Sequence, residues 1–200
     1  MNIAIIDYGM GNLRSVEKAF AHLGYTAHVT SSPADLEKAD KIVLPGVGAF
    51  GDGMRELNNR SLVPVIRALV AQHKPFLGIC LGMQLLFSES EEAPDVKGLN
   101  IIPGRVARFR KGLTVPHMGW NQLHIKRANS LLTSIAEDTY FYFVHSYYVA
   151  PEDTDVVIAT TDYDVEFASI VGTNNLYATQ FHPEKSQHFG LTLLTNFCRL

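Results

Sequence analysis

The sequence lacks most of the features of secreted, membrane-spanning and disulfide-rich proteins. Only two of its 200 residues are cysteines, Cys80 and Cys198, and they form no Cys-x-x-Cys pair. This count excludes a disulfide scaffold and suits a reducing compartment. No run of about 18 apolar residues occurs, so no transmembrane helix is predicted. The N-terminus has no basic segment before Asp7, so no signal peptide is predicted and a cytoplasmic location is expected.

Long runs of one charge are also missing. The formal net charge is −3 at pH 7, which does not favour nucleic acid or a membrane surface as a partner. The hydrophobic fraction of 46% and the charged fraction of 18% indicate a folded globular protein, and residues 1–200 are expected to form one domain. No Cys/His cluster has zinc spacing, so we predict neither a metal nor a cofactor.

Apolar runs alternate with segments of helical period in the first half of the chain. Strands are predicted over residues 2–6, 25–30 and 41–44 and before Cys80, with helices between them that begin near residues 13, 33 and 52. The third helical segment has an expected break at residues 61–64. This β-α-β order indicates a parallel, doubly wound sheet, in which sites form beyond the carboxyl ends of the strands.

The second half of the chain has mainly β patterns. Strands are predicted over residues 101–109, 122–126, 139–149, 156–160, 167–171 and 176–181. A helical turn is expected at 131–135, and Leu191, Leu194, Phe197 and Cys198 share one face of a closing helix. The segment from Arg105 to Val115 has no clear interpretation. The predicted fold is a single α/β domain with a mostly parallel mixed sheet flanked by helices.

Cys80 lies at the turn between a buried strand and an apolar helix, with Gly78 and Gly82 on either side. The pattern Gly-x-Cys-x-Gly is the cysteine version of a nucleophile elbow. Small residues are needed there because the strand and the helix pass very close to each other. The helix N-terminus favours the thiolate. The alternative is a buried cysteine between two incidental glycines.

A cysteine nucleophile needs a base, and the base usually needs a partner that orients it. His182 follows a predicted strand, and Glu184 lies two residues later in an extended segment. The loop from Pro45 to Gly51 lies at the same edge of the sheet and leaves its backbone N–H groups accessible to an anion, although an ordinary turn would have the same composition. The acidic run from Ser88 to Glu92 is either a solvated segment or a source of one carboxylate for a substrate ammonium.

These segments together resemble the class I (triad) glutamine amidotransferases. The resemblance rests on Gly78–Gln84, Pro45–Gly48 and Phe181–Glu184. Three further segments are similar to those of the glutaminase subunits of imidazole glycerol phosphate synthases, which act in histidine biosynthesis: Asp7–Asn12, Pro116–Asn121 and Tyr142–Tyr147. The similarity runs from the first strand to the last helix.

The resemblance implies hydrolysis of glutamine to glutamate and ammonia through a γ-glutamyl thioester. Cys80 would be the nucleophile, His182 the general base and acid, and Glu184 the residue that orients His182. The oxyanion would be held by the backbone N–H of Leu81 and by the strand containing Gly46, Val47 and Gly48, after a peptide flip. Substrate contacts would come from the remaining implied residues: Gln84, Glu92, His145, Ser146 and Tyr147.

The resemblance also implies a heterodimer with a (β/α)8-barrel cyclase. The cyclase would use the ammonia to make imidazole glycerol phosphate and an aminoimidazole carboxamide ribotide. Met118 and Trp120 are residue types that interfaces favour, although a core turn with a buried tryptophan is the alternative. The residues expected to face the cyclase are Met118, Trp120, Asn121, Tyr142 and Lys185.

Three other functions stay open. The chain could be the glutaminase of another synthase, for example one that makes pyridoxal phosphate, anthranilate or GMP, although the Trp120 segment and the Pro45 loop argue against this. It could be a stand-alone thiol hydrolase or peptidase of related fold. It could also be a binding module without catalytic activity.

Overall fold

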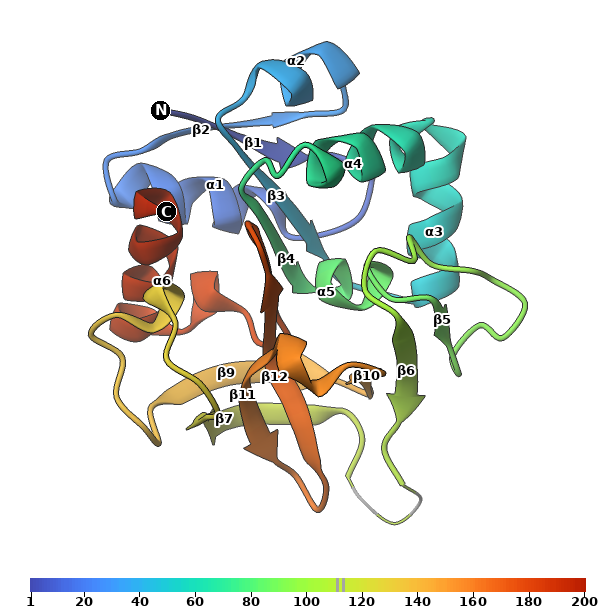
Figure 1. The fold of residues 1–200 in the computed structure, drawn as a ribbon, viewed down its shortest axis with the longest axis vertical. Helices are drawn as coiled ribbons and strands as arrows, with labels where there is room; N and C mark the ends of the chain where they lie inside the picture. Colours follow the sequence, from blue (N-terminus) through green and yellow to red (C-terminus); the bar gives the residue numbers. More distant parts are fainter. Residues whose placement is uncertain (111, 113) are drawn as a thin grey trace.

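A mixed β-sheet with helices on both faces forms the centre of the molecule (Figure 1). The computed structural model describes residues 1–110, 112 and 114–200. In spatial order the strands of this sheet are β2 (Thr26–Thr30), β1 (Asn2–Ile6), β3 (Lys41–Gly46), β4 (Phe76–Cys80), β13 (Leu176–Thr179), β12 (Glu166–Thr173), β10 (Tyr147–Pro151), β6 (Gly104–Arg108) and β5 (Glu89–Ser90).

Two strands branch from this order, and two others form a second sheet. Strand β11 (Val157–Asp162) pairs with β12 and with β8 (His124–Ile125). Strands β7 (His117–Gln122) and β9 (Tyr140–His145) form a separate antiparallel sheet in the lower part of Figure 1.

The helices cover the sheet in two groups. They are α1 (Leu13–His22), α2 (Pro33–Lys38), α3 (Phe50–Asn59), α4 (Leu62–Ala71), α5 (Leu81–Leu85) and α6 (Gln187–Arg199), with 3-10 turns η1 (Ser130–Leu132), η2 (Thr154–Val156) and η3 (Pro183–Lys185). Helices α1 and α6 share one apolar core, and α2, α3, α4 and α5 share the core on the opposite face. Among the described residues, no helix combines the length and apolar character needed to cross a membrane.

The first five strands of the spatial order run parallel to one another, and β12 begins the antiparallel part. Strands β3 and β4 are buried along their whole length, as expected for parallel strands covered on both faces. The predicted mixed, mostly parallel sheet is therefore confirmed. The predicted helix break is also present, since Ser61 has φ +56° between α3 and α4.

Three predicted strands in the second half have different boundaries. The predicted strand 101–109 is β6, which starts only at Gly104, where φ is +138° and a side chain would lie 2.5 Å from the Ala150 carbonyl oxygen. The predicted strand 139–149 is two strands, because the chain leaves the β7–β9 sheet at Ser146 and joins β6 in the central sheet. The predicted strand 122–126 is divided between β7, which starts at His117, and β8. Residues 111 and 113 of the uninterpreted segment lie outside the described residues.

The parallel strands bring their carboxyl ends to one edge of the sheet. In the register of β3 and β4, Gly46 is paired with Cys80. Strand β13 pairs with β4 on its other side and leads directly into the segment containing His182. The topology therefore brings together the elbow, the Pro45 loop and the predicted base.

Candidate active site

Cys80 has a strained backbone, as the elbow motif predicts. Its φ of +55° and ψ of −107° lie in a region that non-glycine residues rarely adopt. The close approach behind it explains Gly82, because a side chain there would lie 1.8 Å from the carbonyl oxygen of Leu44. At Gly78 the space is also limited, since a side chain would lie 3.0 Å from the Gly82 oxygen. The two glycines therefore allow β4 to turn sharply into α5.

His182 and Glu184 form a buried pair next to the elbow. The Nδ1 atom of His182 lies 2.8 Å from Oε1 of Glu184, and the two side chains are 2% and 1% exposed. Burial lowers the pKa of His182, but the charges of Cys80 and Glu184 and the contact with the Glu184 carboxylate outweigh burial, so the pKa is raised to about 10. The Nε2 atom makes no geometrically satisfactory hydrogen bond in the described chain. It is therefore available to exchange a proton with a reacting group.

A cavity of about 350 Å³ opens above Cys80. This volume suits a small ligand. Val47, Gly48 and Leu81 lie on its wall, and Gly46, the residue before Val47, ends β3 and is paired with Cys80. The structure thus places most of the predicted oxyanion and substrate residues around one space, lined by Val47, Gly48, Cys80, Leu81, Gln84, Glu92, Pro116, Val144, His145, Ser146 and Tyr147.

The two neighbouring glutamates of the acidic run have different environments. Glu92 lines the cavity, and its Oε2 accepts a 2.7 Å hydrogen bond from the N–H of Phe50 at the start of α3. Glu91 points elsewhere, because its Oε2 accepts a hydrogen bond from the N–H of Arg108. Of the two carboxylates, only Glu92 is therefore placed to meet a ligand in this cavity.

Two residues near Cys80 were not singled out by the sequence. The Nε2 atom of Gln180 lies 3.8 Å from Cys80 Sγ, and its Oε1 accepts a 3.2 Å hydrogen bond from Gln84. The hydroxyl of Tyr8 is buried without a hydrogen-bond partner among the described residues and occupies the space next to Gly46, where a side chain would lie 2.2 Å from it. Burial, with the charge of Cys80, raises the Tyr8 pKa above its usual value. The feature of the sequence that could have identified these two residues is their position, since each lies at the carboxyl end of a buried strand.

Four of the five predicted contact residues form one patch, in which Met118, Trp120 and Lys185 are exposed and Tyr142 is half-buried. Met118 and Trp120 of β7 are 63% and 45% exposed, so the alternative of a buried tryptophan is wrong. The Trp120 ring meets Tyr142 edge-on at 6.0 Å, and Lys185 Nζ lies 6.0 Å from the same tyrosine ring. Asn121 differs, because its Nδ2 donates to the carbonyl oxygen of Asp162 at 2.8 Å. Its side chain is therefore engaged within the chain.

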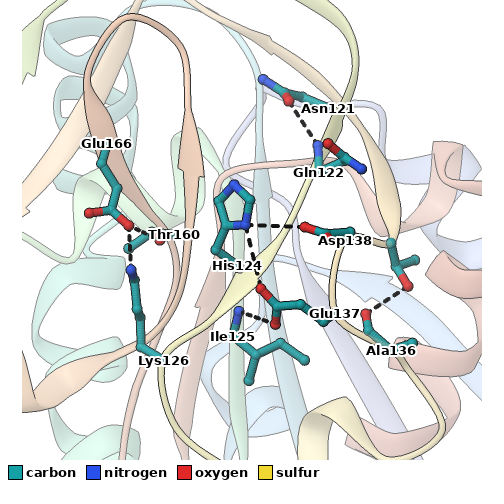
Figure 2. Close-up of polar contacts among 11 residues, drawn as sticks. Asn121, Gln122, His124, Ile125, Lys126, Ala136, Glu137, Asp138, Thr160 and Glu166 are labelled. Atoms are coloured by element: carbon teal, nitrogen blue, oxygen red, sulfur yellow. Dashed lines mark hydrogen bonds and ion pairs between the residues drawn. The ribbon is translucent and has the colours of Figure 1, made fainter.

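Figure 2 shows a group of potential cation ligands, His124, Glu137 and Asp138, of which the two carboxylates are exposed. His124 Nδ1 lies 3.4 Å from Glu137 Oε1 and 3.3 Å from Asp138 Oδ1. Glu137 also accepts a 2.8 Å hydrogen bond from the N–H of Ile125. These contacts connect β8 to the segment before β9. A structural role on the surface therefore explains the cluster.

Comparison with known proteins gives consistent matches over nearly the whole chain. The family model "Glutamine amidotransferase class-I" matches residues 4–199. Proteins called "Imidazole glycerol phosphate synthase subunit HisH" from Syntrophotalea carbinolica and Methanothermobacter thermautotrophicus are each 56% identical, covering 98% and 99% of this chain and 98% of each relative. The protein of the same name from Aquifex aeolicus is 50% identical over 100% of this chain and 97% of its own.

Solved structures show the same fold at much lower identity. A crystal structure of a glutamine amidotransferase has a TM-score of 0.78 and 18% identity, covering 98% of this chain and 97% of its own. The structure of PurLQS from Thermotoga maritima has a TM-score of 0.77 and 18% identity, covering 99% of this chain and 97% of its own.

Proposed function

Because the chain belongs to the class-I glutamine amidotransferases, and within them to the imidazole glycerol phosphate synthase subunits HisH, we propose that Cys80 hydrolyses glutamine with His182 and Glu184. The chain is the glutaminase subunit of that synthase in histidine biosynthesis. The observation that carries the mechanism is the buried His182–Glu184 pair next to a strained Cys80 at the base of a cavity. We propose the cytoplasm as its compartment and residues 1–200 as one amidotransferase domain.

The proposed reaction has two steps. The Cys80 sulfur attacks the side-chain amide carbon of glutamine, and the thiol proton passes to His182. The imidazolium then protonates the leaving nitrogen, so that ammonia departs and a γ-glutamyl thioester remains. In the second step His182 takes a proton from water, the resulting hydroxide attacks the thioester, and glutamate leaves as the sulfur regains its proton.

Charge develops on the substrate oxygen in both steps. The N–H of Leu81 is one proposed donor, because it follows the nucleophile at the start of α5. The strand of Gly46, Val47 and Gly48 is proposed to supply the second. Gly48 has φ +106°, so the loop already uses a conformation that glycine adopts at low cost.

Glu184→Gln is expected to lower kcat/KM by about 10²-fold or more, because the neutral amide no longer holds and stabilises the imidazolium. The Glu184 charge helps to raise the His182 pKa, so its removal lowers that pKa. The imidazolium is then lost at lower pH, and the alkaline limb of the kcat/KM profile should move to lower pH. The profile is measured in the complex with the cyclase, with Glu166→Gln at an exposed carboxylate as the control. An unmoved alkaline limb would argue against the assigned role of Glu184.

Glu92→Gln is expected to raise the KM for glutamine about 10-fold with little change in kcat, because the charge that attracts the substrate ammonium is lost. The amide oxygen can still accept the hydrogen bond from Phe50, so α3 should keep its start. Steady-state kinetics of this variant are compared with those of Glu91→Gln. Equal KM values for the two variants would remove Glu92 from the substrate site.

We further propose that the ammonia is delivered to a (β/α)8-barrel cyclase that docks on the Met118–Trp120 face. The exposed aromatic patch supports this, since interface energy concentrates in residues such as tryptophan. Trp120→Ala is expected to weaken binding of the cyclase by at least about 10-fold, as measured by calorimetric titration of the folded variant. Unchanged affinity would place the cyclase on another face.

The function is tested by assaying glutamate and cyclase product with glutamine as the only nitrogen source. The isolated chain should turn over slowly, and addition of the cyclase with its nucleotide ligand should raise glutaminase activity and yield imidazole glycerol phosphate. Full turnover by the isolated chain would indicate a stand-alone hydrolase. Co-purification with a non-barrel synthase would indicate a different amidotransferase.

A further inference from the structure

Two buried histidines lie side by side at the cavity, His145 in its wall and His117 behind it, and neither takes part in the proton transfers proposed above. His117 of β7 and His145 of β9 face each other in the register of the two strands. Their side chains meet with Nδ1 of His117 3.0 Å from Nε2 of His145. The residues are only 4% and 5% exposed. A buried pair of this kind requires a defined arrangement of protons.

One carbonyl oxygen fixes that arrangement. His145 Nδ1 lies 2.8 Å from the carbonyl oxygen of Tyr147, which can only accept, so Nδ1 carries the proton. Burial lowers the pKa of His145 to about 3 and that of His117 to about 4, so both rings are neutral at neutral pH. A neutral imidazole has one N–H, so His145 Nε2 must accept from His117 Nδ1.

The proton on His117 Nδ1 also determines the role of its other ring nitrogen. With its proton on Nδ1, His117 must accept at Nε2, and Asn121 Nδ2 lies 3.2 Å from that atom. Asn121 is well placed to donate, since its Oδ1 already accepts from the N–H of Gln122 (Figure 2). The hydrogen bonds from Asn121 through both histidines to Tyr147 therefore all point in one direction.

The inner end of this chain reaches the glutamine cavity. The Tyr147 carbonyl oxygen also accepts a 3.0 Å hydrogen bond from Gln84, which contacts Gln180 beside Cys80. The backbone makes a parallel connection, because exposed Met118 is paired with Val144. The Val144 carbonyl oxygen lies 3.9 Å from Cys80 Sγ. Strand β7 is thus joined to the cavity both by side chains and by strand register.

We propose that His117 and His145 are positioning residues that transmit docking on the exposed face of β7 to the Val144–Tyr147 wall of the glutamine cavity. This inference rests on the proposed function. Neither histidine is assigned a step in the chemistry. A shift of β7 moves its hydrogen-bonded partners, and the fixed direction of the bonds transfers that shift to the Tyr147 carbonyl and to Gln84.

The kinetic test measures the stimulation ratio, which is kcat with the cyclase and its nucleotide ligand divided by kcat of the isolated chain. His117→Phe keeps an aromatic ring against Tyr163 and Phe143 but removes both hydrogen bonds, so the ratio should fall about 10-fold. His117→Asn can still donate to His145 and should recover part of the ratio. His124→Phe changes an exposed histidine on β8 and should leave the ratio unchanged. An unchanged ratio in His117→Phe, or equal losses with and without the cyclase, would overturn the proposal.

A second measurement does not depend on activity or on a folded variant. ¹⁵N NMR of the wild-type chain should show both rings as neutral Nδ1–H tautomers at pH 7, with both rings changing their shifts when the cyclase binds. An Nε2–H tautomer at either histidine, or shifts that do not respond to the cyclase, would contradict the relay. A wild-type chain without glutaminase activity would instead contradict the proposed function, while the NMR result would still decide whether the relay exists.

Discussion

Replacing Cys80 with alanine is expected to lower partner-stimulated glutamine hydrolysis by at least about 10³-fold, because no other described group near the cavity can form the thioester. The turn should be retained, because the strain at φ +55° belongs to the backbone and is the same for alanine as for cysteine. Binding of the cyclase should therefore be retained. Glutamate release is measured in the complex under saturating glutamine.

Cys198 provides the matched control. It is the second cysteine of the chain and is buried on α6, in the core shared with α1. Burial raises the pKa of its thiol to about 12, so it is protonated at neutral pH and a poor nucleophile. Cys198→Ala should keep glutaminase activity within a few-fold of the wild type. Activity that survives in Cys80→Ala would overturn the mechanism.

Gly82→Ala is expected to destabilise the fold by about 3–5 kcal/mol and to remove most of the activity. The added methyl group would lie 1.8 Å from the carbonyl oxygen of Leu44, so β3 and the elbow must move apart. Because β3 carries Gly46, the same movement would displace the proposed oxyanion strand from Cys80. Urea unfolding and glutaminase assays measure the two effects.

Gly51→Ala is the control for this substitution. Gly51 lies within α3, and its added methyl group would meet two side chains, Ala93 at 3.2 Å and Val96 at 3.8 Å, rather than backbone. Alanine is favoured over glycine in a helix, so the two effects should nearly cancel and leave stability within about 1 kcal/mol. If both variants unfolded at the same urea concentration, close approach of the strand and the elbow would not explain Gly82.

The sequence predicted the first half of the fold better than the second. Buried strands and amphipathic helices alternate up to Cys80, and each has a clear local signal, such as the Ser32 cap whose Oγ accepts from the N–H of Asp35. The aromatic run from Thr139 to Val149 carries no such signal at Ser146. Strand propensity is equally high on both sides, so only pairing with β7 and then β6 shows where the chain changes sheets.

The same distinction applies to the site. Cys80, His182 and Glu184 could be named from local motifs and resemblance, because each lies in a short segment whose residue types are recognisable, Gly78–Gln84 or Phe181–Glu184. The link from Asn121 through His117 and His145 could not, since it depends on strand register between two histidines 28 residues apart in the sequence. The placement of Tyr8 could not be predicted for a similar reason, because its hydroxyl occupies the space next to Gly46, which only the folded chain brings beside it.

The most direct test of the central claim is covalent trapping of Cys80 with a diazo-ketone analogue of glutamine, in the complex with the cyclase and its nucleotide ligand. Peptide mass spectrometry should find one label per chain on Cys80 and none on Cys198, and excess glutamine should prevent labelling. A chain that stays unlabelled at Cys80 while it hydrolyses glutamine would contradict the account.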